Sequence, residues 1–263
     1  MIEGYFQDRI YFRRNDFVAG RQNLIFMHGL SGSLSAWRFY EDRFSANYNL
    51  LFFDLRGHGK SIKKRDFGYY DPKNTAEDIN GLAKKFGMDR FVLVSHSFST
   101  LLALEYARTY SQTVKSLILL APDYRIAQTA RAKMAWPFLT FSQINNLLPF
   151  EERIGKHIDY SKFIGSGDWD WRRLFADISN TSLRVYCHCL RQARKTDGWK
   201  LICGIKLPVL IIHGKKDTVF PCSDSVLLAK KIPGARLKIL PEANHILVIN
   251  NHKEVAEEIV KFI

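Results

Sequence analysis

Short apolar runs alternate along the chain with stretches whose apolar residues recur at helical spacing. The runs predict buried strands at residues 23–27, 49–54, 91–94, 114–120, 208–212 and 236–239. Residues 5–18 predict an opening hairpin or pair of edge strands, and the other stretches predict helices at 75–86 (with Thr75 as N-cap), 98–109, 223–231 and 254–263. Strands that are apolar on both faces and alternate with helices are typical of a mainly parallel sheet covered on both sides. We therefore expect an α/β fold whose functional residues lie in loops that follow strands.

The alternation stops between residues 123 and 203. This stretch has helix-compatible sequence and many aromatic side chains, and it is too long for a structureless loop. We interpret it as a helical cap inserted into a core made of residues 1–122 and 204–263. A cap over a catalytic centre forms part of its pocket wall, so Trp136, Phe138 and Phe141 are candidates for lining a substrate pocket.

Composition places the chain among ordinary globular proteins. It has 263 residues, of which 46% are apolar and 25% charged. Its longest apolar runs are far shorter than the roughly 20 residues that cross a bilayer, and its first residues do not resemble a secretory signal. Four cysteines in a chain of this length make no disulfide framework. We therefore expect a cytoplasmic protein without a transmembrane segment.

The net charge of +13 raises the possibility of an anionic partner. The excess of Lys and Arg is spread along the whole chain, and its short basic clusters lack interleaved aromatic residues that could stack on bases. We therefore expect a small-molecule substrate and no nucleic acid, with the charge serving solubility or attraction of an anionic substrate. The oligomeric state stays open.

A serine marks the corner between a predicted strand and a predicted helix. The segment Ser95-His96-Ser97-Phe98-Ser99 follows the apolar run 91–94 directly. A tight turn at this place exposes the side chain of Ser97 at the end of the sheet, with the N–H of Phe98 beside it at a helix N-terminus. Ser97 alone could be an ordinary helix N-cap, but its place at this corner favours a nucleophile.

Together with this corner, four further segments, taken in chain order, resemble those of the α/β-hydrolase fold family. His28-Gly29-Leu30 is similar to its oxyanion loop, residues 54–61 to its D-x-R-G-x-G-x-S turn, and residues 213–217 to its acid loop. Asn244-His245 matches the position of its catalytic histidine. The resemblance covers nearly all of the chain outside the cap, and it implies an α/β-hydrolase fold. It also implies a triad of Ser97, Asp217 and His245, with the amides of Leu30 and Phe98 as the oxyanion hole.

The chain departs from the family pattern at three positions. Ser95 and Ser99 stand where the family has glycine, two positions before and two after the nucleophile, in the strand-to-helix corner called the elbow. Asn244 stands where glycine usually precedes the histidine. The serines are small enough to fill a tight turn with some strain. Asp123, which follows the strand at 114–120, is a rival for the catalytic acid because some family members place the acid there.

The predicted function is a serine hydrolase of the carboxylesterase or lipase type, which cleaves an ester or related carbonyl bond of a small to medium, apolar substrate through an acyl-enzyme. Two alternatives stay open: a carbon–carbon bond hydrolase or cofactor-free oxygenase-type enzyme on the same triad, and a hydrolase-like receptor with little turnover. We expect no metal or organic cofactor. Cys187-His188-Cys189 lacks a second ligand pair at the spacing that zinc sites use.

Overall fold

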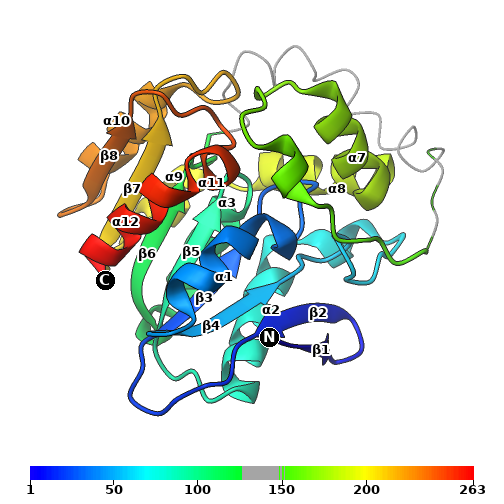
Figure 1. Ribbon diagram of the computed structural model, residues 1–263, viewed down its shortest axis with the longest axis horizontal. Helices are drawn as coiled ribbons and strands as arrows, with labels where there is room; N and C mark the ends of the chain where they lie inside the picture. The colour runs from blue at the N-terminus through cyan, green and yellow to red at the C-terminus, as the bar shows by residue number, and fades with distance from the viewer. Residues whose placement is uncertain (126–147, 149, 151) are drawn as a thin grey trace.

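The computed structural model describes residues 1–125, 148, 150 and 152–263. Within these residues, eight strands form one sheet in the order β1-β2-β4-β3-β5-β6-β7-β8, shown in Figure 1. Strands β3 to β8 pair in parallel, and β1 and β2 add an antiparallel edge. The strands are β1 (Ile2–Phe6), β2 (Ile10–Arg14), β3 (Asn23–Met27), β4 (Asn49–Phe53), β5 (Phe91–His96), β6 (Val114–Leu120), β7 (Val209–Gly214) and β8 (Arg236–Leu240).

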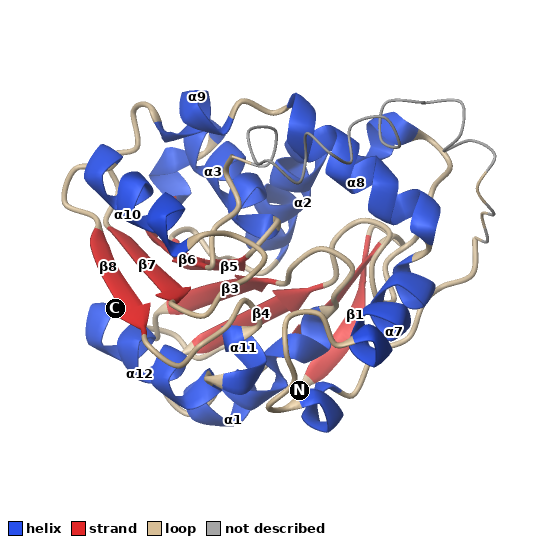
Figure 2. Cartoon of the chain, turned by 90° about the horizontal axis from the view of Figure 1, so that it is seen from above, coloured by secondary structure: helices blue, strands red, loops and turns tan. Residues whose placement is uncertain are grey.

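Helices cover both faces of the sheet (Figure 2). One face carries α2 (Pro72–Lys85), α3 (Ser99–Thr109), α9 (Gly198–Ile202) and α10 (Cys222–Lys231), and the other carries α1 (Arg38–Phe44), α11 (Leu247–Asn250) and α12 (His252–Phe262). Like α9, helices α7 (Trp171–Thr181) and α8 (Leu183–Lys195) lie between β6 and β7 in the sequence. The short 3₁₀ helices are η1 (Leu34–Trp37), η2 (Phe67–Tyr70), η3 (Ser111–Thr113) and η5 (Tyr160–Phe163).

The two-sided core follows from the alternation of side chains along each strand. In β3, Ile25 and Met27 pack under α2 and α3, whereas Leu24 and Phe26 pack against α1 and η1. All four side chains are fully buried. The near-continuous apolar sequence of the central strands is therefore explained by helices on both faces, as expected for a parallel sheet.

The predicted α/β fold is confirmed, with corrections at the ends of elements. The opening hairpin lies earlier than residues 5–18, and β5 and β7 each extend two residues beyond the predicted end. Thr75 is not an N-cap, because α2 begins at Pro72. Asp71 is the cap: its carboxylate accepts a hydrogen bond from the N–H of Lys73 at 2.9 Å, and Pro72 fits the first helical position because it needs no N–H partner there.

The division into core and cap stays a prediction. The described part of residues 123–203 does not form a separate hydrophobic unit, because Val185 and Cys189 of α8 and Leu201 of α9 belong to the same buried cluster as α2 and α3. The predicted pocket residues Trp136, Phe138 and Phe141 lie outside the described residues. In the described ranges, no helix combines the length and apolar character that a membrane crossing requires.

Helix α7 has its polar side inward. Arg173, Asp177 and Thr181 are buried and bonded to neighbouring groups. Trp171 and Phe175, by contrast, are 74% and 71% exposed. Burying a polar group costs little stability when the group keeps its hydrogen-bond partners. The contacts on the inner side therefore fix the rotation of the helix about its axis, which leaves the aromatic residues on the outer side.

A buried ion pair joins the loop after β4 to helix α2. The guanidinium of Arg56 donates from Nε and Nη2 to the Asp78 carboxylate at 2.5 and 2.9 Å, and both side chains are buried. Arg9, which is more exposed, contacts the same carboxylate at 3.5 Å. Removing one partner of a buried pair leaves the other charge without compensation.

We expect Arg56→Ala to lower the free energy of unfolding by about 3–5 kcal/mol, because it leaves the buried Asp78 carboxylate without its main partner. Arg9→Ala is the matched control and should cost less than about 1 kcal/mol, since its contact is long and solvated. Urea unfolding followed by circular dichroism measures both. Equal losses for the two variants would contradict this prediction.

Candidate active site

Ser97 occupies the corner between strand β5 and helix α3. Its φ angle is 54°, a left-handed conformation that residues other than glycine rarely adopt. The N–H of Ser97 donates to the carbonyl of Leu120 in β6 at 2.9 Å, which fixes the corner against the sheet. Strained residues persist where the surrounding structure over-determines them, and they cluster at active sites. The corner brings the Ser97 side chain against the loop that carries His245.

Ser97, His245 and Asp217 form a chain of hydrogen bonds. Ser97 Oγ lies 2.8 Å from His245 Nε2, and His245 Nδ1 lies 2.8 Å from Asp217 Oδ2. An ionised carboxylate can only accept hydrogen bonds, so Nδ1 carries the proton and Nε2 is left to accept from the Ser97 hydroxyl. The three residues follow β5, β7 and β8, whose carboxyl ends meet at one edge of the sheet. This is the arrangement in which a serine hydroxyl can lose its proton to an imidazole.

The Asp217 carboxylate is fully buried and accepts hydrogen bonds on both oxygens. Oδ1 accepts from the N–H groups of Val219 and Phe220 at 2.7 and 2.8 Å, and Oδ2 lies 3.1 Å from His213 Nε2 as well as bonding His245. Burial alone raises the pKa of Asp217, but hydrogen bonds from His213 and His245, with the backbone N–H of Phe220, outweigh it and hold the pKa well below its usual range. Asp217 is therefore an ionised partner for the histidine.

The two elbow serines are accommodated in different ways. Ser99 is fully buried, and its Oγ accepts from the N–H of His96 at 3.0 Å and lies 3.0 Å from the carbonyl of Met27 in β3. Ser95 Oγ has only a 3.4 Å contact, with the carbonyl of Ile118. The hydroxyl at position 99 therefore ties the elbow to the neighbouring strand, whereas the one at position 95 fills space.

The loop after β3 passes close to the nucleophile. A Cβ built at Gly29 would lie 3.0 Å from His96 Nδ1 and 3.4 Å from Ser97 Cβ, so a larger residue would press on the elbow. His28 supports this loop: its Nε2 accepts from the N–H of Leu55 at 3.0 Å, and its Nδ1 donates to the carbonyl of Gly29 at 2.8 Å. Burial lowers the pKa of His28, which favours this neutral form.

The two predicted oxyanion donors come from different parts of the chain, the N–H of Phe98 beside the nucleophile and the N–H of Leu30 in the loop after β3. Leu30 lies in the turn closed by the bond from Gly32 N–H to Gly29 O at 3.1 Å, and Phe98 follows Ser97 directly. Within the described ranges, neither the Leu30 nor the Phe98 N–H donates to a backbone carbonyl. Their binding of an oxyanion stays a prediction.

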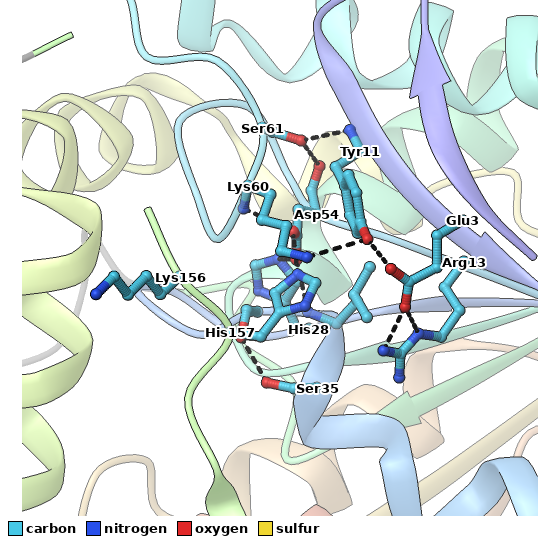
Figure 3. A network of polar contacts seen from close by, with 12 residues as sticks. Glu3, Tyr11, Arg13, His28, Ser35, Asp54, Lys60, Ser61, Lys156 and His157 are labelled. Atoms are coloured by element: carbon cyan, nitrogen blue, oxygen red, sulfur yellow. Dashed lines mark hydrogen bonds and ion pairs between the residues drawn. The ribbon is translucent and has the colours of Figure 1, made fainter. Parts of the chain in front are cut away.

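Asp54 anchors a second polar network, shown in Figure 3. Its Oδ1 accepts from the N–H of Leu34 at 2.7 Å, and its Oδ2 accepts from the N–H of Lys60 and from His157 Nε2, each at 2.8 Å. Asp54 begins the segment 54–61, and His157 lies between β6 and β7 in the sequence. The carboxylate thus holds together the loop after β4, helix η1 and the predicted cap.

A family profile described as the alpha/beta hydrolase fold matches residues 22–252. The chain belongs to the α/β hydrolase fold family. The match spans the elbow, the acid loop and the histidine loop, and the sheet order and covering helices described above agree with it.

Similar proteins of this family include enzymes named for ester substrates. The chain is 26% identical over 284 residues to the protein named "Probable lysophospholipase BODYGUARD 1" of Arabidopsis thaliana, covering 91% of this chain and 58% of the relative. It is 23% identical over 264 residues to the pimeloyl-(acyl-carrier protein) methyl ester esterase of Hamiltonella defensa, covering 92% and 93%. This chain thus spans less than two thirds of the Arabidopsis relative's length.

Solved structures of the family share the fold. An esterase from Exiguobacterium antarcticum superposes with a TM-score of 0.74 at 20% identity, covering 96% of this chain and 94% of the other. The enol-lactonase from Burkholderia xenovorans LB400 has a TM-score of 0.71 at 19% identity, covering 96% and 95%. At these identities the similarity shows the fold alone.

Asp123, the rival acid, has no hydrogen bond to the histidine among the described residues. The ring nitrogen that a catalytic acid would bond, His245 Nδ1, is bonded to Asp217. Asp123 is buried, and its Oδ1 has no hydrogen-bond partner among the residues the structure describes. Burial, with Asp224 nearby, raises the pKa of Asp123 to about 7. Asp123 is therefore a buried acid beside the site whose hydrogen bonds are incomplete among the described residues.

Three residues of the site have contacts that their sequence positions did not reveal. The sequence identified Asn244 only as a departure from glycine, but its Nδ2 donates to the carbonyl of Ser166 at 3.0 Å. The sequence showed His96 only as part of the segment around the nucleophile, yet its Nε2 bonds the carbonyl of His245 at 2.9 Å. Asp168 carried no sequence signal at all, and it accepts from the N–H of His245 at 2.8 Å.

We expect Ser99→Ala to lower the free energy of unfolding by about 1–3 kcal/mol, because the substitution removes the hydrogen bonds of Ser99 Oγ to buried backbone groups of His96 and Met27. Ser95→Ala is the matched control, with an expected change below about 1 kcal/mol, since its contact is at the limit of a hydrogen bond. Urea unfolding of both variants measures the difference. A cost at position 95 as large as that at 99 would show that the hydroxyl bonds are not the cause.

We expect Asp123 to make the protein less stable as the pH rises. A carboxyl whose folded pKa is raised favours folding below its unfolded value, near 4, and loses that contribution as the pH rises through the folded value, about 7. Asp123→Asn cannot ionise, so its loss of unfolding free energy between pH 5 and pH 8 should be smaller than that of the original protein by about 1–3 kcal/mol. Urea unfolding at both pH values checks this, and parallel pH profiles would contradict it.

Proposed function

We propose that the protein is a serine hydrolase that cleaves a carboxylic ester through an acyl-enzyme. The observation that carries this proposal is the uninterrupted chain of hydrogen bonds from Ser97 Oγ through His245 to the buried, ionised Asp217. Each residue stands at the sequence position that its role requires in the α/β hydrolase fold family. The relatives named as a methyl ester esterase and a lysophospholipase support an ester as the substrate class.

The proposed acylation begins with the Ser97 hydroxyl. Its oxygen attacks the ester carbonyl carbon while His245 Nε2 takes the hydroxyl proton. The negative charge that develops on the carbonyl oxygen is stabilised by the N–H groups of Leu30 and Phe98. Asp217 stabilises the imidazolium and keeps Nδ1 protonated. When the intermediate collapses, the bond to the alcohol breaks and His245 returns the proton to the departing oxygen.

The proposed deacylation repeats these roles with water as the nucleophile. His245 Nε2 takes one proton from water as its oxygen attacks the acyl carbon, and Ser97 then leaves with that proton. The products are a carboxylic acid and an alcohol, and the enzyme regains its starting state. Every proton in the cycle is carried by His245, so no metal or organic cofactor enters a step.

The proposed acyl group is apolar and of small to medium size. Phe98, which follows the nucleophile, is buried in the apolar core, and the aromatic candidates Trp136, Phe138 and Phe141 lie in the predicted cap. Apolar walls with few polar groups are typical of pockets for such ligands. A series of p-nitrophenyl esters of increasing acyl length tests the size directly.

We expect Ser97→Ala to abolish ester turnover while leaving the fold intact. The substitution removes the attacking oxygen and exchanges one small residue for another in the strained turn. Kinetics with p-nitrophenyl esters, paired with circular dichroism and mass-spectrometric mapping of a fluorophosphonate adduct, measures both effects. Turnover retained by the purified variant, or an adduct on a residue other than Ser97, would contradict the assignment. An adduct on Ser97 without hydrolysis of any ester would favour the carbon–carbon hydrolase or receptor alternatives.

We expect Asp217→Asn to lower kcat by about 10⁴-fold, because an amide favours the wrong tautomer of His245. Asp123→Asn is the matched control and should leave kcat within a few-fold, since Asp123 makes no bond to the histidine. Steady-state kinetics of both variants at pH 8 decides between the two acids. A larger loss at position 123 would assign the acid to the loop after β6.

A further inference from the structure

A short segment far from the triad in sequence contacts both loops that carry its histidine and acid. This bridging segment, residues 165–169, precedes helix α7. The carbonyl of Ser166 accepts from Nδ2 of both Asn244 and Asn250, at 3.0 and 2.9 Å, and the indole of Trp169 donates to Thr218 Oγ1 at 3.0 Å. Residues on either side of the histidine and directly after the acid are therefore bonded to the same segment.

Asp168 makes the central contacts of the bridging segment. Its Oδ1 accepts from the backbone N–H of His245 at 2.8 Å. Its Oδ2 accepts from the backbone N–H and from the hydroxyl of Thr218, each at 2.8 Å. Thr218 follows Asp217 in the chain, so one buried carboxylate spans the gap between the histidine loop and the acid loop.

Asp168 is itself held rigidly. Arg173 donates from Nη2 to the carbonyl of Asp168 at 2.7 Å, and its Nη1 pairs with Asp177 Oδ2 at 3.1 Å. The other oxygen of Asp177 accepts from the hydroxyl of Tyr160 at 2.8 Å. These groups lie on the inward, polar side of α7 and its surroundings, so the position of Asp168 depends on how that helix is seated.

The backbone of His245 is fixed from two directions. Asp168 accepts from its N–H, and His96 Nε2 lies 2.9 Å from its carbonyl. A carbonyl only accepts, so His96 Nε2 carries the proton; burial lowers the pKa of His96 to about 3, which keeps the ring neutral in this arrangement. The elbow beside the nucleophile holds one end of the histidine's backbone, and the bridging segment holds the other.

We propose that Asp168 is a positioning residue that makes alignment of the triad depend on docking of the bridging segment. The proposal deepens the function proposed above and rests on it, because it concerns the same serine, histidine and acid. Asp168 touches neither the nucleophile nor the histidine ring; it acts through the backbone of His245 and Thr218. Displacement of the segment releases both loops together.

The chemistry of the contacts requires a carboxylate. Three donors converge on Asp168: two backbone N–H groups and one hydroxyl. Asparagine has the same shape but only one acceptor oxygen, so its NH₂ group would face an N–H at one of the two loops. Asp168→Asn therefore keeps the volume of the side chain and breaks one arm of the bridge.

We expect Asp168→Asn to lower kcat by about 10–100-fold with KM changed less than about threefold, because small displacements of catalytic groups are costly at the chemical step while the pocket is untouched. Rates are normalised to active sites titrated with a fluorophosphonate. Asp170→Asn is the matched control, since Asp170 is the N-cap of α7 and asparagine is an equally good cap. Its kcat should stay within about twofold of the original.

A spectroscopic measurement separates positioning from a structural role and from the proposed function. In protein labelled with ¹⁵N-histidine, the Nδ1 proton of His245 bonded to Asp217 gives a downfield resonance, assigned by its loss in His245→Asn. We expect Asp168→Asn to shift or broaden this resonance and Asp170→Asn to preserve it. An unchanged resonance and kcat in Asp168→Asn, or a loss of stability alone, overturns the proposal. If the original protein hydrolyses no ester, the function proposed above fails, while the resonance still decides the role of Asp168.

Discussion

Parallel pairing of the central strands is the constraint on which the rest of this molecule depends. Strands β3 to β8 have their carboxyl ends at one edge of the sheet, so loops distant in sequence meet there. Ser97 and His245, 148 residues apart, come within a hydrogen bond for this reason. Parallel strands also need crossover connections, and these supply the helices that bury both faces of the sheet.

Loops at such an edge need their own sources of rigidity, because they lack the ladder of hydrogen bonds that holds a strand. Here buried polar side chains supply it. Asp54 holds the loop after β4, His28 holds the loop after β3, and Asp217 is bonded by the backbone of its own turn. Each of these groups is buried with its partners satisfied, which is the condition under which a polar contact rigidifies rather than destabilises.

The fold was predictable from sequence because its strands and helices follow from local patterns, whereas Asp217 and His245 were expected only from the resemblance to a family. Continuous apolar runs predicted the strands, and the serine at the end of one of them predicted the corner with its unusual backbone. Thr75 was assigned wrongly as the N-cap, because the helix begins earlier, at Pro72, which fits the first helical position after Asp71. The resemblance favoured Asp217 as the acid but left Asp123 as a rival, since the choice depends on which carboxylate reaches the histidine.

Asp168 illustrates what no local pattern contains. It lies in a stretch without strand periodicity, and its partners Thr218 and His245 are 50 and 77 residues away. A contact of this kind is created by the docking of one segment on two others, and it becomes visible only when all three are placed.

The outward aromatic face of helix α7 bears on how the protein behaves in concentrated solution. Trp171 and Phe175 present apolar surface to water, and exposed patches of this kind promote association between molecules. The helix is held by Arg173, Asp177 and Thr181 on its opposite side, so its packing does not depend on the exposed aromatic side chains. One side of the helix thus governs association between molecules, and the other governs how the helix packs. The outer side can be made more hydrophilic without loosening the inner contacts.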